Sequence, residues 1–144
     1  MASSRLEIET YENPTIEYML KRPLDPRFAD AVLAGRKFTT IREKPWPVGS
    51  PIMLYHWAGA AYRSKHVDVA PIIVQGFWSI YISHLADGSM RYVYGMEHAK
   101  PLHETEGFDS RAAMAAWFRS LVKSGQTVTR TLMRFRLAKQ GRDL

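Results

Sequence analysis

The middle of the chain, from Ile52 to Tyr94, constrains the fold more than any other part of the sequence. It contains four short runs that are rich in β-branched and aromatic residues: Ile52–Trp57, Val67–Gly76, Trp78–His84 and Met90–Tyr94. Such residues favour strands because their side chains pack well on a pleated surface. The tripeptide Ala86-Asp87-Gly88 has the composition of a tight turn between the last two runs. Short strands with tight connections predict a small barrel or a strongly curved sheet.

Strand patterns also occur on both sides of this region. Alternating side chains predict a short strand near Ile16–Leu20, a second one at residues 37–43 and a last one over Thr127–Leu137. In the last segment, apolar residues at odd positions alternate with arginines at positions 130, 134 and 136. This alternation is typical of a strand with one buried face and one solvated face.

Two helices are predicted from their capping signals. Asp25 can cap a helix that has Pro26 at its first position and Gly35 just beyond its end, which gives a helix over about Pro26–Ala34. A second helix, from about Ser110 to Lys123, can be capped by Asp109 or Ser110 and has apolar residues at intervals of three and four. We therefore expect an α+β fold, in which a small β-barrel of about five or six strands carries two flanking helices.

The length of 144 residues, with 46% hydrophobic and 24% charged residues, fits one globular domain. Residues 1–14 are polar, include the acidic residues Glu7, Glu9 and Glu12, and show no sustained period. We expect this segment to be a mobile lead-in to a single domain over residues 15–144.

The composition excludes several classes of protein. Without cysteine, the chain can form no disulfide, no thiolate zinc site and no cysteine nucleophile. No apolar run approaches the roughly 18 residues of a membrane helix, and the amino terminus lacks the apolar centre of a secretory leader, so we expect a cytoplasmic protein without a membrane partner. The five histidines make no recognised metal spacing, and we expect neither a metal nor a cofactor. A net charge of +6 favours an acidic partner such as RNA.

The segment Gly35-Arg36-Lys37-Phe38-Thr39-Thr40-Ile41-Arg42 is the strongest candidate for chemistry. In an extended chain Thr40 and Arg42 share a face, and Lys37 lies in the preceding bend, from which it can approach Thr40. A lysine can activate a hydroxyl as a nucleophile when burial or neighbouring cations, here Arg36 and Arg42, lower its pKa. The alternative is a solvated basic turn after a helix.

The pattern G-x-K-x-x-T-x-R follows a predicted helix that ends in Leu-Ala-Gly and precedes the loop Pro47-Val48-Gly49. This arrangement resembles the ASCH family, whose fold is a PUA-like β-barrel, and the resemblance extends over about Ile16–Leu137. The family usually has glutamate where Thr40 stands. Threonine there is similar to a branch of amidohydrolases that remove the acetyl group from the exocyclic amine of 4-acetylcytidine.

The resemblance implies a set of catalytic residues. In that branch a lysine and a threonine of this motif work with a glutamate from a downstream segment, which implies Lys37, Thr40 and Glu106, with Glu97 and Glu104 as competing candidates. Thr40 would attack the acetyl carbonyl and Lys37 would take its proton. Glu106 would position the lysine or protonate the leaving amine, and Arg42 or backbone N–H groups would stabilise the oxyanion.

The chain is longer than the compact amidohydrolases, with extra residues around Ala58–His66 and Ser79–Glu97. The segment from Trp57 to His66 mixes aromatic and cationic side chains, as a surface that stacks bases and holds phosphates would. Alternatively, it is a hairpin whose aromatic residues pack on the barrel and whose cations are solvated. The residues predicted to bind the substrate are Arg36, Arg42, Tyr62, Arg63 and Lys65.

Three functions remain open from the sequence. The first is binding of RNA or a modified nucleoside in a cleft, with hydrolysis of the acetyl amide of 4-acetylcytidine or a related amide. The second is a noncatalytic RNA-binding module. The third is a ribonuclease that cuts single-stranded RNA, because that activity also resembles what some ASCH proteins do.

Overall fold

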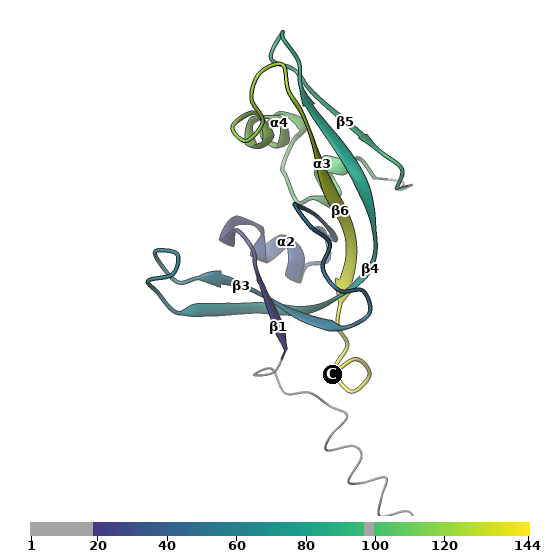
Figure 1. Cartoon of the computed structure of the whole chain (residues 1–144). Coiled ribbons are helices and arrows are strands. Elements are labelled where there is room, and N and C mark those ends of the chain that lie inside the picture. Colours follow the sequence, from purple (N-terminus) through teal and green to yellow (C-terminus); the bar gives the residue numbers. More distant parts are fainter. Residues whose placement is uncertain (1–18, 97–99) are drawn as a thin grey trace, which may run out of the picture.

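The protein is built on one mixed sheet of six strands, which curves around short helices on its concave side (Figure 1). The computed structural model describes residues 19–96 and 100–144. The sheet has the order β1-β3-β4-β6-β2, and β5 pairs with β4 outside this path. The strands are β1 (Leu20–Pro23), β2 (Thr39–Arg42), β3 (Pro51–Trp57), β4 (His66–His84), β5 (Met90–Tyr94) and β6 (Thr127–Leu137). The predicted α+β class and the expected number of strands are confirmed.

Two predictions about the amino terminus concern residues that the structure does not describe, or describes only in part. The expected mobile segment 1–14, and all but the end of the expected strand near Ile16–Leu20, lie outside the described residues. The strand β1 shares Leu20 with this prediction but continues to Pro23, and it pairs in parallel with β3.

The sheet is not closed into a barrel, so that part of the prediction is wrong. The two outer strands of the path, β1 and β2, do not pair with each other. The chain between them forms the 3-10 turn η2 (Pro26–Phe28) and the helix α2 (Ala29–Leu33). This segment is helical and sends Leu24, Phe28 and Val32 into the core, and it adds no strand between β1 and β2.

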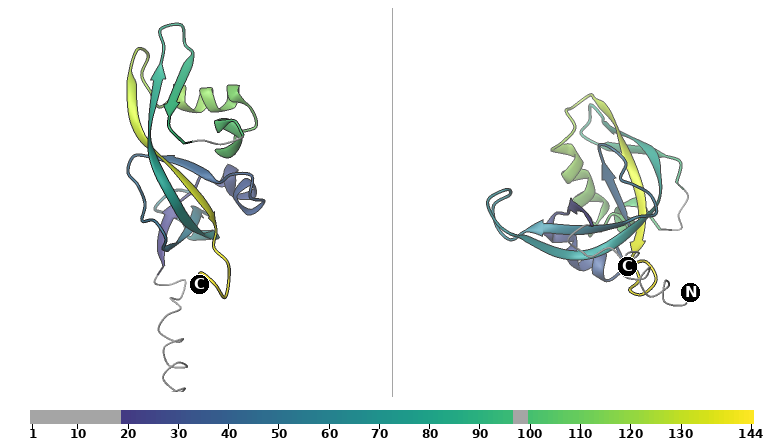
Figure 2. Two further views of the ribbon diagram at one scale, coloured as in Figure 1. Left: turned by 90° about the vertical axis from the view of Figure 1, so that its right-hand side faces the viewer. Right: turned by 60° about the horizontal axis from the view of Figure 1, so that its bottom comes forward.

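The longest element is β4, a single strand of 19 residues where two strands were predicted. Its first half pairs with β3 and its last residues pair with β5, while β6 follows its other edge from Ile72 to Ser83. The register with β6 shifts between Val74 and Gly76. Gln75-Gly76 therefore forms a β-bulge, and such bulges bend a strand without ending it. Figure 2 shows β4 running through both halves of the molecule.

The core consists of two clusters of buried apolar side chains, one in each half of the sheet. The first cluster contains Leu24, Phe28, Val32, Trp46, Ile52, Leu54, Ala70, Ile72, Val74, Met133 and Phe135. The second contains Ile80, Ile82, Met96, Leu102, Met114, Phe118, Val122 and Leu132. Phe108 and Trp117 pack against both clusters, so these two aromatic rings join the halves.

The helices confirm the predicted caps more closely than the predicted lengths. The Asp25 side chain accepts a hydrogen bond from the backbone N–H of Arg27, but the first turn is 3-10 and not α-helical. The second predicted helix is α4 (Arg111–Arg119), with Ser110 as its cap, and it ends earlier than expected. A one-turn helix, α3 (Leu102–Thr105), was not predicted. No helix in the described ranges is long and apolar enough to cross a membrane.

Candidate functional site

A cleft of about 280 Å³ lies where the two core clusters meet. Four of the residues that the sequence singled out line it together: Lys37, Thr40, Arg42 and Glu106. The remaining lining residues are mainly aromatic, aliphatic and charged side chains from η2, β2, α4 and β6: Leu24, Asp25, Phe28, Ile41, Glu43, Phe108, Trp117, Phe118, Leu121 and Arg130. The cleft thus combines a polar group of side chains with an aromatic wall.

The end of α2 places Lys37. Gly35 has a φ of 75°, and the N–H groups of Gly35 and Arg36 donate to the carbonyls of Val32 (3.0 Å) and Ala31 (2.9 Å). This pair of bonds is a Schellman motif, which ends a helix and turns the chain sharply. The turn directs Lys37 inward, where its side chain is 4% exposed and its Nζ lies 5.0 Å from the centre of the Phe28 ring.

The end of α3 places Glu106 by the same device. Gly107 has a φ of 90°, and the N–H groups of Gly107 and Phe108 donate to the carbonyls of Glu104 (3.0 Å) and His103 (2.9 Å). A Cβ atom on residue 107 would lie 3.1 Å from the Cβ of Lys37 and 3.2 Å from the Phe28 ring. Only glycine fits this position without displacing its neighbours, because of both the space and the left-handed backbone.

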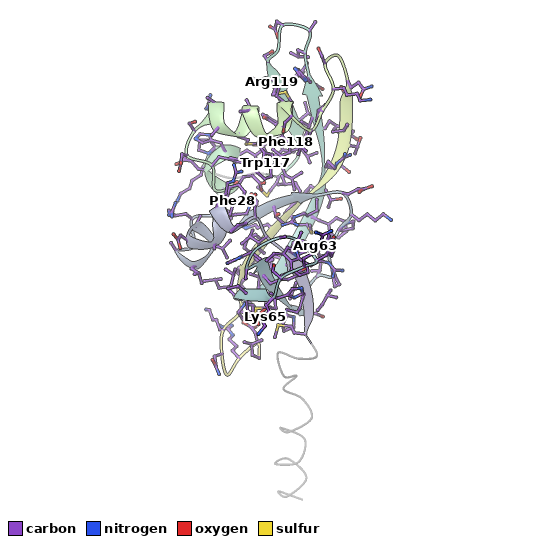
Figure 3. All side chains as sticks on the ribbon, turned by 90° about the vertical axis from the view of Figure 1, so that its left-hand side faces the viewer. Phe28, Arg63, Lys65, Trp117, Phe118 and Arg119 are labelled. Carbon is purple, nitrogen blue, oxygen red and sulfur yellow. The ribbon has the colours of Figure 1, made fainter. Side chains whose placement is uncertain are left out.

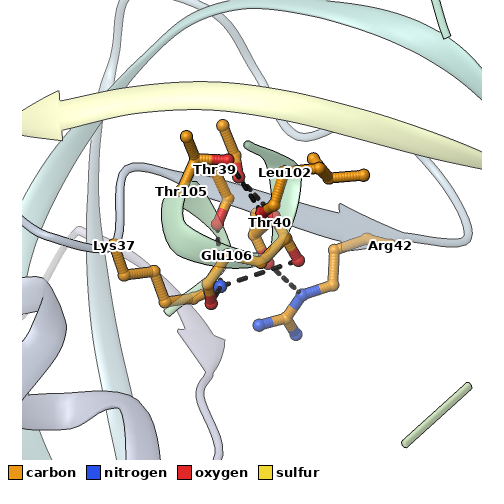
Figure 4. A network of polar contacts seen from close by, with 7 residues as sticks. All are labelled: Lys37, Thr39, Thr40, Arg42, Leu102, Thr105 and Glu106. Atoms are coloured by element: carbon orange, nitrogen blue, oxygen red, sulfur yellow. Dashed lines mark hydrogen bonds and ion pairs between the residues drawn. The ribbon is translucent and has the colours of Figure 1, made fainter. Parts of the chain in front are cut away.

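The two Schellman turns bring Lys37 and Glu106 into contact. The Lys37 Nζ donates to the carbonyl oxygens of Thr39 (2.7 Å) and Glu106 (2.8 Å) and lies 3.8 Å from the Glu106 Oε1 (Figure 4). Burial lowers the pKa of Lys37, the Glu106 carboxylate partly opposes this shift, and the Arg42 guanidinium adds to it. The lysine is therefore closer to its neutral form than a solvated lysine is at the same pH.

Two threonines that the sequence analysis missed support the carboxylate. The Thr39 hydroxyl donates to the Glu106 Oε2 (2.5 Å) and lies 3.0 Å from the Thr105 hydroxyl, which donates to the carbonyl of Leu102 (3.1 Å). Both threonines are fully buried. Strand alternation indicated only that Thr39 and Thr40 face opposite ways. The partner of Thr39 comes from a segment 67 residues away, which local patterns cannot indicate.

Thr40 and Arg42 form a second pair on the cleft side of β2. The Arg42 Nε donates to the Thr40 Oγ1 at 3.0 Å, and the Arg42 guanidinium lies 4.7 Å from the centre of the Trp46 ring. Thr40 is 4% exposed. Because the hydroxyl oxygen accepts this bond, the hydroxyl proton remains available for another partner.

The other predicted residues that the structure describes do not line the cleft. Arg36 is exposed and does not line it, and Glu104 is exposed on α3. Glu97 lies outside the described residues. Of the two candidate glutamates in the described residues, Glu106 is thus the one that the structure brings to Lys37.

Tyr62, Arg63 and Lys65 lie together at the tip of the β3–β4 hairpin. Figure 3 shows Arg63 and Lys65 in the lower half of the molecule, apart from Phe28, Trp117 and Phe118 at the cleft. None of these three residues lines the cleft that Lys37 lines.

The described residues contain no group of three or more side chains that could hold a metal ion. Comparison with known proteins gives no match to a protein-family model, to a curated sequence or to a solved structure. The resemblance to the ASCH family therefore stays a prediction from the motif around Lys37.

Proposed function

We propose that the protein is an amidohydrolase that removes the acetyl group from the exocyclic amine of 4-acetylcytidine or a related acylated nucleoside. The proposal depends on one observation above all. A buried lysine with a lowered pKa, a buried carboxylate and a threonine hydroxyl line the same cleft. Nucleophilic catalysis by a hydroxyl needs such a base near it.

The hydrogen bonds of Lys37 suit a general base. A neutral amine has two N–H groups and one lone pair, and the Nζ already donates to two carbonyls, those of Thr39 and Glu106. Both protons of the neutral form are thus used, and the lone pair can accept a proton. When the lysine becomes charged, the carboxylate of Glu106 at 3.8 Å compensates the charge.

The reaction then takes two steps. The Thr40 hydroxyl attacks the acyl carbon while Lys37 takes its proton, and Arg42 stabilises the negative charge that develops on the carbonyl oxygen. The C–N bond breaks, the exocyclic amine takes the proton from Lys37, and an acyl ester remains on Thr40. Water activated by Lys37 hydrolyses this ester, which releases acetate and restores the hydroxyl.

The aromatic wall supports a planar substrate. Phe108 and Trp117 line the cleft together with the polar residues, and aromatic side chains stack on nucleobases. The volume of about 280 Å³ lies near the lower end of the range of small-molecule sites, roughly 300–1,000 Å³. This size favours a single nucleoside over a longer ligand.

The test is to incubate the protein with 4-acetylcytidine and to measure released acetate and cytidine. Lys37→Ala and Thr40→Ala should each reduce turnover at least about a hundredfold, and the double variant should lose little more. Thr40→Ser should keep part of the activity. Lys123→Ala, which removes an exposed lysine outside the cleft, should behave as the parent.

The pH dependence provides a second readout. Because Lys37 acts in its neutral form, turnover should rise with pH and level off above the pKa of Lys37. Burial lowers this pKa below the 10.5 of a free lysine. Near-normal turnover of Lys37→Arg would contradict base catalysis, since a guanidinium does not lose its proton. Binding of labelled RNA without acetate release would favour the noncatalytic module, and cut strands would favour the ribonuclease.

A further inference from the structure

The β3–β4 hairpin carries an ordered set of aromatic rings that the proposed reaction does not use. His66 stacks on Tyr55 with their centres 3.8 Å apart, and the rings of Trp57 and His66 are nearly perpendicular with their centres 4.3 Å apart. The centre of the Tyr62 ring lies 5.2 Å from that of Trp57, and the two rings are inclined at 50°. We name these four residues the hairpin platform.

The hairpin platform lies outside the two core clusters. On β3, Ile52 and Leu54 belong to the first core cluster, so Tyr55 and Trp57 lie on the opposite face of the strand. Tyr55 is buried beneath His66, whereas His66 is exposed, Trp57 is half-buried and Tyr62 is 90% exposed. Figure 2 shows the hairpin extending beyond the rest of the sheet.

The backbone at the tip is arranged around Tyr62. Its φ of 64° is the one positive value among the described residues other than glycine. Tyr62 is the third residue of a turn closed by the N–H of Arg63 and the carbonyl of Ala60 (3.2 Å), and glycine usually fills such a position. The Ser64 hydroxyl holds the tip by bonding the Gly59 N–H and the Ala60 carbonyl. The tip thus presents an exposed ring on a residue with a strained backbone conformation.

The charges at the tip favour an anionic ligand. Arg63 and Lys65 are exposed, and in the described part of the chain no carboxylate lies within ion-pair distance of either. Asp68, the acidic residue of this hairpin, is paired with Lys21 at 2.9 Å. An anionic ligand with planar groups matches both features, because cations bind phosphates and aromatic rings stack on bases.

We propose that the hairpin platform is a second binding site, for single-stranded nucleic acid, in which Trp57, Tyr62 and His66 stack on bases while Arg63 and Lys65 contact phosphates. This site is independent of the cleft and of the amidohydrolase activity. It does not require a particular base sequence, since every base has a face on which a ring can stack.

The experiment measures binding of a fluorescein-labelled oligouridylate of about 12 nucleotides, with an oligothymidylate of the same length as a second arm. Tyr62→Gly should weaken binding about tenfold, because one stacked base is lost, without lowering the melting temperature. Arg63→Gln/Lys65→Gln should reduce the slope of log K against log salt concentration by about 1.4. Binding should also quench tryptophan fluorescence, and Trp57→Phe should remove most of this quenching.

The control is Arg91→Gln/Lys123→Gln, which removes two exposed cations away from the hairpin. It should change the affinity less than about threefold. Equal weakening by this control and by the hairpin double variant would overturn the proposal, because net charge alone would then explain binding. Parental affinity of Tyr62→Gly, or no binding at 50 mM salt, would also overturn it. So would binding that Thr40→Ala abolishes and Tyr62→Gly leaves intact, because the strand would then lie in the cleft.

Discussion

The cleft and the β3–β4 hairpin use the same kinds of side chain, cations and aromatic rings, but in the cleft they are buried and on the hairpin they are mostly exposed. In the cleft Lys37 is buried against Phe28, and its charge is balanced by Glu106 and by two backbone carbonyls. On the hairpin Tyr62, Arg63 and Lys65 are exposed. The comparison indicates that catalysis in the cleft would require the packed fold around it. Binding on the hairpin would depend mainly on a few exposed side chains. Substitutions in the cleft should therefore lower the free energy of unfolding more than those on the hairpin.

The largest expected effect is on the buried ion pair. Glu106→Gln removes the charge that compensates Lys37, so the free energy of unfolding should fall by about 4 kcal/mol at pH 7. The loss should shrink at pH 10, because deprotonation of Lys37 removes the uncompensated cation. Urea unfolding at both pH values measures this. Glu104→Gln, at an exposed position two residues earlier, should change stability little, and an equal loss in both variants would contradict the assignment.

A slightly smaller effect is expected at the turn that places Glu106. Gly107→Ala should lower the free energy of unfolding by about 3 kcal/mol, from the left-handed backbone together with the contacts of the new Cβ with Lys37 and Phe28. Gly125→Ala is the matched control, because Gly125 has a φ of 79° and nothing within 4 Å of its Cβ position. That variant should lose only about 1 kcal/mol. Similar losses in thermal unfolding would show that packing around Gly107 is loose.

The third prediction separates two adjacent threonines. Thr39→Val should lower the free energy of unfolding by about 2 kcal/mol, because the Glu106 carboxylate and the Thr105 hydroxyl both lose a buried hydrogen-bond partner. Thr40→Val should cost about 1 kcal/mol, since it loses only the bond from Arg42, yet it should abolish amide hydrolysis. Thr39→Ser should restore most of the stability. If Thr40→Val were the more destabilising variant, Thr40 would be structural.

The smallest effect is expected on the hairpin and has the opposite sign. Tyr62→Gly should raise the free energy of unfolding by about 0.5 kcal/mol, because glycine adopts a positive φ without strain. Ala61→Gly, in the same turn but without a positive φ, should lower it by about 0.5 kcal/mol. Calorimetry of the two variants tests this pair, and a destabilised Tyr62→Gly would show that the ring holds the hairpin together.

The sequence predicted the parts of the site that lie close together along the chain. Lys37, Thr40 and Arg42 are separated by a bend and a short strand, so capping signals and strand alternation were enough to place them together. Glu106 was reached only through a family resemblance, and two other glutamates competed with it. Thr39 and Thr105 were missed because their contact depends on the packing of α3 against β2, which no local pattern encodes.

The fold shows the same division between local and long-range information. The strand runs, the cap at Asp25 and the turn at Gly35 were predicted because they follow from local preferences. Whether β1 and β2 would meet to close a barrel depends on the path of the chain between them. Two strands were predicted in place of β4 because Gln75-Gly76 has a composition that usually ends a strand. The pairing of β4 with β6 shows that this dipeptide is a β-bulge within one strand.

The length of β4 has a consequence for how the protein opens. Ala70, Ile72 and Val74 of this strand belong to one core cluster, and Ile80 and Ile82 belong to the other. Amide protons in the middle of β4 should therefore exchange with solvent only when the whole molecule unfolds, and not through local fluctuations of either half. A cleft between two clusters that share a strand is lost in that same event. Loss of activity under denaturing conditions and exchange of these amides should thus follow a single transition.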